Sequence, residues 1–305
     1  MRQILILAFS ILFFGISNAQ NIYSKAFGDK QNPAILFIHG GPSGNSNLFE
    51  GTTAEILASK NFYVIVYDRR GEGRSKDESA TMTFEESFND INQILNLYNL
   101  KKVNLLGHSF GGIIATLFTQ KFPKKVNSLT LVGALFSQQE TYDHILANAK
   151  INFKSNKHKL TEISEIENLN KNSAVYRKEC FDLASEMDYF TMPNETNESI
   201  ELRKKFEESN IYKTNFRNVK SPFKFYKNES KNNIDNTNIL KEIKKNQIPI
   251  YAIYGKNDGI FSNKQLENLR NIVGKQNLEI LDNCSHYLFV DQQDQFLNFM
   301  LKKIK

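Results

Sequence analysis

The stretch at residues 103–112, VNLLGHSFGG, decides the fold of this chain. Residues 103–106 are predicted as a short buried strand, and a helical pattern begins near Gly111, so Ser109 falls on the turn between them. Residues 107–111 fit G-x-S-x-G, in which flanking glycines let a sharp turn push the serine hydroxyl into the open. The motif alone is common by chance, but between a strand and a helix it indicates a nucleophile, Ser109.

Short apolar runs alternate with helical patterns on both sides of this stretch. The other runs cover residues 34–38, 62–67, 126–132, 248–254 and 278–281. The helical patterns cover residues 84–98, 111–121 and 292–304. This alternation predicts an α/β fold with a mostly parallel central sheet flanked by helices.

The strand pattern is interrupted between residues 136 and 247, where Lys, Glu and Asn are frequent and the periodicity is helical. We expect a mainly helical cap inserted over the carboxyl edge of the sheet. The predicted organisation is a signal peptide at 1–19, the first part of the core at 20–135, the cap at 136–247 and the second part of the core at 248–305.

The first 19 residues have the pattern of a secretory signal peptide. Arg2 is followed by an apolar run at 4–16 and by Ser17-Asn18-Ala19, a small-residue cleavage site before Gln20. The run is shorter than the roughly 20 residues of a spanning helix. We therefore expect an exported protein, periplasmic or secreted, without stable membrane insertion after cleavage. An uncleaved N-terminal anchor is the alternative.

Charge and the spacing of Cys and His residues argue against nucleic-acid partners and bound metals. The net charge is +6, but the lysines are interleaved with Glu and Asn, which indicates a solvated surface rather than a nucleic-acid site. No Cys/His cluster has metal-ligand spacing, and no cofactor is expected. Export would permit a disulfide between Cys180 and Cys284, but two free, part-buried thiols are expected.

Two residues after late strands complete a catalytic constellation. Asp258 follows the run at 248–254, and His286 follows the run at 278–281. A serine hydroxyl needs a histidine to take its proton and an acid to orient that histidine. The order Ser109, Asp258, His286 fits this chemistry. Asp282 is the rival acid, but it is close to His286 in sequence.

A glycine-rich turn, His39-Gly40-Gly41-Pro42, follows the run at 34–38. By itself it would be an ordinary turn, but beside the serine it predicts an oxyanion hole made by the N–H groups of Gly41 and Phe110. The segment at 68–75, DRRGEGRS, is given a structural role, bracing loops near the site by charge and tight turns.

The segments HGGPSG (39–44), DRRGEGRS (68–75), GHSFGG (107–112), YGKNDG (254–259) and CSHYLFVDQ (284–292) resemble α/β-hydrolases across the chain after its leader. The first two look most like the prolyl aminopeptidase (proline iminopeptidase) family. The resemblance implies a helical cap, a triad of Ser109, Asp258 and His286, oxyanion donors at Gly41 and Phe110, and removal of N-terminal residues from peptides.

The chain departs from that family in two motifs. Ser43 stands where HGGPG has glycine, and His108-Ser109-Phe110 stands where typical family members carry Gly-Ser-Trp. Family members bind the free amine of the substrate with acidic cap residues. The candidates here are Glu195, Glu198, Glu201, Glu207 and Glu208.

Three functions are therefore compared. The first is an exported aminopeptidase acting on short peptides. The second is a carboxylesterase or lipase acting on small acyl esters with the same triad. The third is a catalytically silent binding protein, which the intact triad disfavours. Relatives with an aspartate nucleophile are disfavoured by Ser109.

Overall fold

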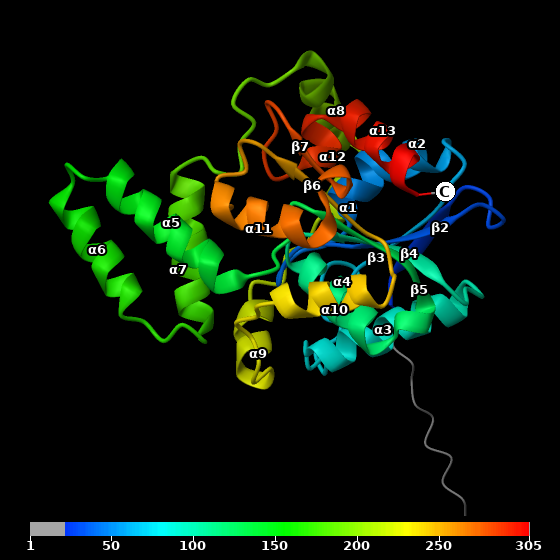
Figure 1. Ribbon diagram of the computed structural model, residues 1–305, viewed down its shortest axis with the longest axis horizontal. Helices are drawn as coiled ribbons and strands as arrows, with labels where there is room; N and C mark the ends of the chain where they lie inside the picture. Colours follow the sequence, from blue (N-terminus) through cyan, green and yellow to red (C-terminus); the bar gives the residue numbers. More distant parts are fainter. Residues whose placement is uncertain (1–21, 305) are drawn as a thin grey trace, which may run out of the picture.

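The computed structural model describes residues 22–304, and the predicted signal peptide at 1–19 lies outside the described residues. Within this range, seven strands form one sheet in the order β1-β3-β2-β4-β5-β6-β7 (Figure 1). The strands are β1 (Ser24–Phe27), β2 (Ala34–Ile38), β3 (Tyr63–Tyr67), β4 (Val103–His108), β5 (Val126–Val132), β6 (Ile250–Gly255) and β7 (Leu278–Leu281). Strand β1 pairs antiparallel with β3, and the other pairings are parallel. The predicted mostly parallel sheet is confirmed.

Helices cover both faces of this sheet. The core helices are α1 (Asn47–Phe49), η1 (Glu50–Ala54), α2 (Glu55–Ala58), α3 (Phe84–Leu97), α4 (Phe110–Lys121), α10 (Thr237–Lys245), α11 (Asn263–Val273), α12 (Leu288–Asp291) and α13 (Gln293–Lys303), with short turns η2 (Pro123–Lys125) and η4 (Lys275–Asn277). Neighbouring residues of β2 point to opposite faces. Leu36 joins the apolar cluster under α3 and α4, and Phe37 joins the cluster under α2 and α13.

The chain between β5 and α10 forms the cap. Its helices are α5 (Gln138–Asn152), α6 (Lys157–Glu167), α7 (Ala174–Glu186), α8 (Asn197–Glu208) and α9 (Ser221–Asn228), with the turn η3 (Tyr212–Thr214). Helices α5, α6 and α7 pack together and project beyond the sheet (Figure 1), whereas α8 lies beside η1 and α12. Helix α10 falls inside the predicted insertion at 136–247, but it packs against α4 and α11 of the core.

The cap leaves and rejoins the core at one place. The N–H of Gln138 donates to the carbonyl of Ile234 at 2.9 Å, and the N–H of Asn236 donates to the carbonyl of Phe136 at 2.6 Å. These bonds surround a single bridge between Ser137 and Asp235. The first and last residues of the insertion are therefore held side by side.

The sheet order brings four loops to one edge. Strand β2 lies between β3 and β4, so the chain leaves β2 in one direction and later returns on its other side. Loops after such neighbouring strands diverge and leave a crevice at their carboxyl ends. Ile38 aligns with Gly107, and Gly255 aligns with Leu281. The loops after β2 and β4 are thus adjacent, as are the loops after β6 and β7.

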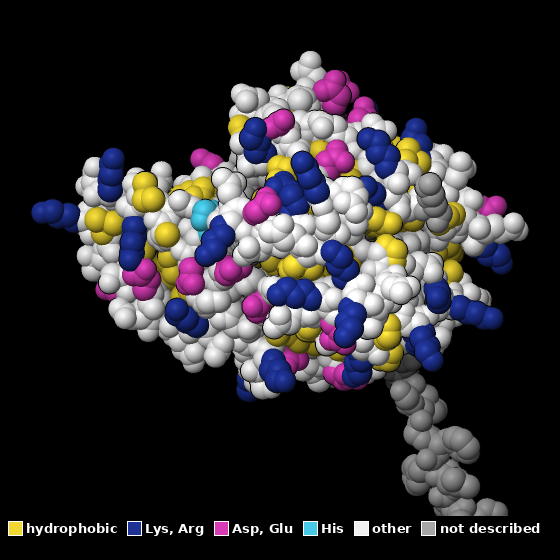
Figure 2. Space-filling view, in the orientation of Figure 1, with side chains coloured by type: hydrophobic (Ala, Val, Ile, Leu, Met, Phe, Trp, Pro, Cys, Tyr) yellow, Lys and Arg dark blue, Asp and Glu magenta, His cyan; other side chains and the backbone are white. Residues whose placement is uncertain are grey.

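The surface carries mixed charge. Figure 2 shows Lys and Arg side chains dispersed over one face among Asp and Glu side chains, rather than gathered in one patch. Across residues 22–304, none of the helices has both the length and the apolar content needed to cross a bilayer. Cys180 and Cys284 are both buried and both free, without a disulfide between them.

Candidate active site

Ser109 occupies the turn between β4 and α4, in a backbone conformation that side chains rarely adopt. Its φ is 52° and its ψ is −124°, and its side chain is partly exposed. Surrounding structure must hold such a strained residue in place. The Ser109 N–H donates to the Val132 carbonyl at 3.2 Å, and the Leu135 N–H donates to the Ser109 carbonyl at 3.0 Å.

A steric constraint requires glycine at position 111, the last residue of the G-x-S-x-G motif. A Cβ atom at Gly111 would collide with the backbone carbonyl of Ile38, at the end of β2. The absence of a side chain therefore lets α4 begin directly against the neighbouring strand, with Ser109 at its N-terminus.

His286 and Asp258 meet in the loops after β7 and β6. The Nδ1 atom of His286 lies 2.7 Å from Oδ2 of Asp258, and both side chains are buried. Because a carboxylate only accepts, Nδ1 carries the hydrogen, and Nε2 is left free to accept a proton. Burial raises the pKa of Asp258, and the charge of His286 opposes that rise.

The rival acid, Asp282, lies elsewhere. Its side chain is 81% exposed and pairs with Lys256 at 2.6 Å. Asp258 is therefore the acid that contacts His286.

The residue before the serine contacts the histidine. The His108 ring lies 4.8 Å from the His286 ring, and Nε2 of His108 donates to the His286 carbonyl at 3.0 Å. Burial lowers the pKa of His108 to about 3, so this side chain is neutral. In the described chain no hydrogen bond joins the Ser109 hydroxyl to His286.

The loop after β2 approaches the serine. A Cβ atom at Gly40 would lie 3.1 Å from Cβ of Ser109. The next residue, Gly41, has a φ of 147°, which favours glycine, and precedes Pro42 through a cis peptide bond. Phe110 is the first residue of α4, where N–H groups have no acceptor within the helix. Of the two predicted oxyanion donors, Phe110 directly follows the serine, and Gly41 follows the glycine that faces it.

The segment at 68–75 braces this loop. The guanidinium of Arg69 donates to the carbonyl of Gly40 at 2.8 Å, and the Arg69 N–H donates to Nε2 of His39 at 3.0 Å. Glu72 pairs with Arg69 at 2.7 Å and accepts from the N–H of Ser43. The two charges neutralise each other while holding the loop.

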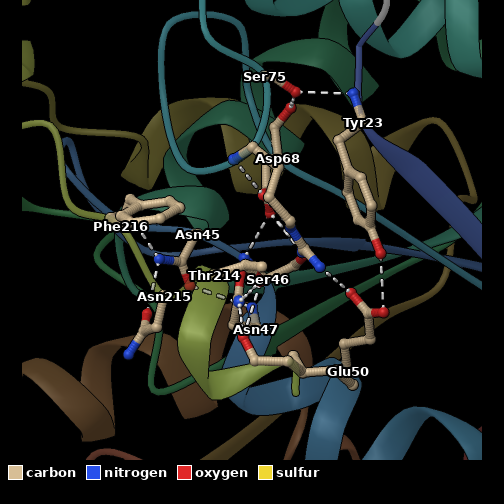
Figure 3. A network of polar contacts seen from close by, with 12 residues as sticks. Tyr23, Asn45, Ser46, Asn47, Glu50, Asp68, Ser75, Thr214, Asn215 and Phe216 are labelled. Carbon is tan, nitrogen blue, oxygen red and sulfur yellow. Dashed lines mark hydrogen bonds and ion pairs between the residues drawn. The ribbon is translucent and has the colours of Figure 1, made fainter.

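Another arginine of that segment, Arg74, connects distant parts of the chain. Figure 3 shows Tyr23, Glu50 and Asp68, which surround it. Nε of Arg74 lies 2.7 Å from Asp68, and Nη1 lies 2.7 Å from Glu50. The guanidinium also stacks 3.5 Å from the centre of the Tyr23 ring. Nearby, Asn45 donates to Asn215 of the cap at 2.8 Å. The network joins the edge strand, the core and the cap.

Two cap residues contact the site loops and were not identified from the sequence. Nη2 of Arg177, on α7, donates to the carbonyl of Gly41 at 2.7 Å. Arg203, on α8, pairs at 2.6 Å with Asp291, which accepts from the N–H of Ser285 at 2.8 Å. Asp291 lies in the CSHYLFVDQ segment, but no sequence motif marks either arginine.

The five acidic cap candidates are all exposed: Glu195, Glu198, Glu201, Glu207 and Glu208. Four of them lie on α8, which packs beside α12, and Glu195 lies two residues before that helix. The part of the chain that the structure describes contains no group of three His, Cys, Asp or Glu side chains that could hold a metal ion.

Three comparisons place this chain among known proteins. Residues 33–293 match the family model described as alpha/beta hydrolase fold. A proline iminopeptidase of Lactobacillus acidophilus is 23% identical over 282 residues, covering 90% of each chain. The predicted resemblance to α/β-hydrolases and to proline iminopeptidases is confirmed.

Solved structures support the same fold. A proline iminopeptidase-related protein of Thermus thermophilus superposes with a TM-score of 0.66 at 21% identity, covering 93% of this chain and 94% of the other. A carboxylesterase of Nitrososphaera gargenis superposes with a TM-score of 0.61 at 16% identity, covering 94% and 95%.

Proposed function

The chain belongs to the alpha/beta hydrolase fold family and is a hydrolase, and from that premise we propose that it is a serine hydrolase with Ser109 as nucleophile. His286 is the general base, and Asp258 orients it. The observation that carries this proposal is the strained Ser109 turn beside a buried His286–Asp258 pair with a 2.7 Å contact.

The proposed reaction has two halves. Ser109 Oγ attacks the carbonyl carbon of the substrate while Nε2 of His286 takes the hydroxyl proton. The tetrahedral intermediate collapses, His286 returns the proton to the departing amine or alcohol, and an acyl-enzyme remains. Water then attacks this ester, again giving a proton to His286, and the acid leaves as Ser109 recovers its proton. Asp258 stabilises the imidazolium in both halves.

The negative oxygen of each intermediate needs donors. The N–H of Phe110 stands at the start of α4, where the helix dipole favours negative charge. The N–H of Gly41 is the second proposed donor, in the loop that Arg69 braces. Removing one such donor in a comparable enzyme costs roughly 10²–10³-fold in kcat.

For the substrate we propose a short peptide with a free N-terminus, cleaved in the manner of a prolyl aminopeptidase. The full-length relative in Lactobacillus acidophilus is named a proline iminopeptidase. The HGGP turn at 39–42 supports the same class. The enzyme would release one N-terminal residue per turnover.

A specific observation favours an esterase as the second candidate. The five glutamates that could bind a free amine are exposed, and Glu72 near the loop is already paired with Arg69. Among these six described glutamates, none is both unpaired and placed at the loop beside Ser109, so none of them explains selectivity for a cationic amine. A carboxylesterase acting on small acyl esters would need none.

Labelling with a fluorophosphonate tests the nucleophile. We expect covalent labelling of wild-type protein at Ser109 and none of Ser109→Ala. Ser109→Ala should retain the folded circular dichroism spectrum while turnover falls roughly 10⁴–10⁶-fold. A variant that kept a tenth of wild-type activity would refute the assignment, and an unlabelled wild type would favour a silent binding protein.

A substrate panel separates the two enzyme classes. Prolyl and other aminoacyl arylamides are compared with their N-acetylated forms and with short-chain aryl esters. The peptidase proposal requires acetylation to lower kcat/KM by orders of magnitude. Fast ester cleavage without amidase activity would favour the esterase.

We also propose that the protein is exported, with residues 1–19 removed as a signal peptide. The support is the sequence pattern alone, in which Arg2 precedes an apolar run and Ala19 precedes Gln20.

A further inference from the structure

Arg177, on the cap helix α7, contacts the loop beside Ser109. Its Nη2 donates to Gly41, whose neighbour Gly40 faces the serine. The same guanidinium lies 4.8 Å from the centre of the Phe181 ring, on the same helix. Phe181 in turn lies 6.2 Å from Phe190. Arg177 thus lies between the loop at 39–42 and an aromatic wall of the cap formed by Phe181 and Phe190.

That aromatic wall reaches the catalytic base. The Phe190 ring meets the His286 ring edge to face at 5.3 Å. The Phe190 carbonyl accepts from the Ser285 hydroxyl at 3.0 Å. Arg177 is therefore connected to His286 through the rings of Phe181 and Phe190, and to the Ser109 side of the site through Gly41.

The positive charge of Arg177 is not neutralised. Within residues 22–304, no carboxylate lies within ion-pair distance of it, whereas Arg69, Arg70, Arg74, Arg203 and Arg270 each pair with an acid. Its Nε atom is buried and, among the described residues, has no hydrogen-bond partner. A buried cationic donor without an acceptor is costly, so such groups normally face a ligand or an ion.

Two tyrosine hydroxyls complete the surroundings. Burial raises the pKa of Tyr142 and of Tyr226, and the nearby Arg177 charge opposes that rise in both. The two hydroxyl oxygens lie 3.4 Å apart. Uncharged hydroxyls beside a guanidinium can donate to an anion but cannot neutralise the cation.

We propose that Arg177 is a specificity-determining residue that binds a carboxylate carried by the substrate. The guanidinium presents donors in a planar fork that fits a carboxylate. This inference rests on the proposed serine hydrolase function and names its substrate class. In a dipeptide substrate, the carboxylate would be that of the departing residue, and in an ester it could lie on the acyl group.

Matched substrate pairs test it. The leaving-group pair is 4-acetoxybenzoate and 4-acetoxybenzamide, and the acyl pair is the 4-nitrophenyl esters of succinic and pentanoic acid. Wild type should favour the anionic member of one pair by roughly tenfold or more in kcat/KM, and that pair identifies the side that carries the carboxylate. Arg177→Met should lose the preference, and Arg177→Lys should keep part of it.

Lys178→Met is the control, because Lys178 is exposed and follows Arg177 on the same helix. It should keep the wild-type preference. Binding of the same pairs to Ser109→Ala and to Ser109→Ala/Arg177→Met gives a readout without turnover, and fluorophosphonate labelling reports separately on the nucleophile. The proposal is overturned if neither pair shows an anion preference, or if Arg177→Met lowers both members equally, which would mean that Arg177 only props up Gly41.

Discussion

At the scale of single residues, the site depends on two residues held against their usual preferences. Ser109 has a positive φ, and His108 is a buried histidine. The first exposes a hydroxyl at the end of a helix. The second donates to the backbone of His286 and so helps to position the proposed base.

The burial of His108 predicts an acid-dependent loss of stability. The unfolded chain binds a proton at this side chain near pH 6.5, whereas the folded state stays neutral down to about pH 3. The unfolded state therefore binds more protons in this window. The free energy of unfolding should fall by about 1.4 kcal/mol per pH unit below 6.5 for this group. Burial lowers the pKa of His39 as well, which acts in the same direction.

Urea unfolding at pH 7 and pH 5 measures the effect. His108→Gln keeps an N–H donor but cannot titrate, so it should lose about 2 kcal/mol less than wild type over this interval. His158→Gln, at an exposed position, should behave as wild type. Equal losses in wild type and His108→Gln would show that His108 is not held neutral.

At the scale of elements, the brace around Arg74 predicts a large effect on stability. Arg74→Met would leave the buried Asp68 without its arginine partner, and it would leave the buried Glu50 with only the more distant Lys25, at 3.6 Å. Breaking a buried pair by removing one partner costs about 3–5 kcal/mol. Urea unfolding at pH 7 measures the change, with Lys264→Met at an exposed position as the control. A loss below about 1 kcal/mol would contradict the role of the brace.

The sequence predicts the buried elements closely. The apolar runs at 34–38, 126–132 and 278–281 coincide with β2, β5 and β7. Strand β1 was not predicted, because its residues, SKAF, lie at the sheet edge, are only partly buried and form no apolar run. The pattern at 292–304 corresponds to α13 alone, and the short helix α12, which ends just before it, was not predicted. Periodicity reports burial, so it weakens where an element is exposed.

The serine, histidine and aspartate positions follow from motifs and chain order, but the contacts of the cap do not. Glutamates on α8 are abundant, yet they face solvent. Arg177 reaches the site because α7 packs on α5 and α9, and no local pattern in the sequence encodes that arrangement.

At the scale of the whole molecule, the export proposal predicts a mature chain that begins at Gln20. Cleavage there keeps Tyr23, whose hydroxyl donates to Glu50 at 2.9 Å, in the folded protein. Intact mass of the exported protein measures the start. Ala19→Tyr should block cleavage, because the site needs a small residue. An intact chain in the membrane fraction would favour an uncleaved anchor, and one in the cytoplasm would refute export.

The two ends of the cap lie side by side, and this arrangement bears on how the protein can evolve. Because the chain departs at Ser137 and returns at Asp235 through adjacent hydrogen bonds, the whole insertion can be exchanged at one junction without altering any strand of the sheet. Insertions succeed at sites where the two ends are close. The proposed catalytic residues of the core and the substrate-contacting residues of the cap can therefore change independently during evolution. A different cap inserted at this junction would keep the catalytic residues and alter the substrate specificity.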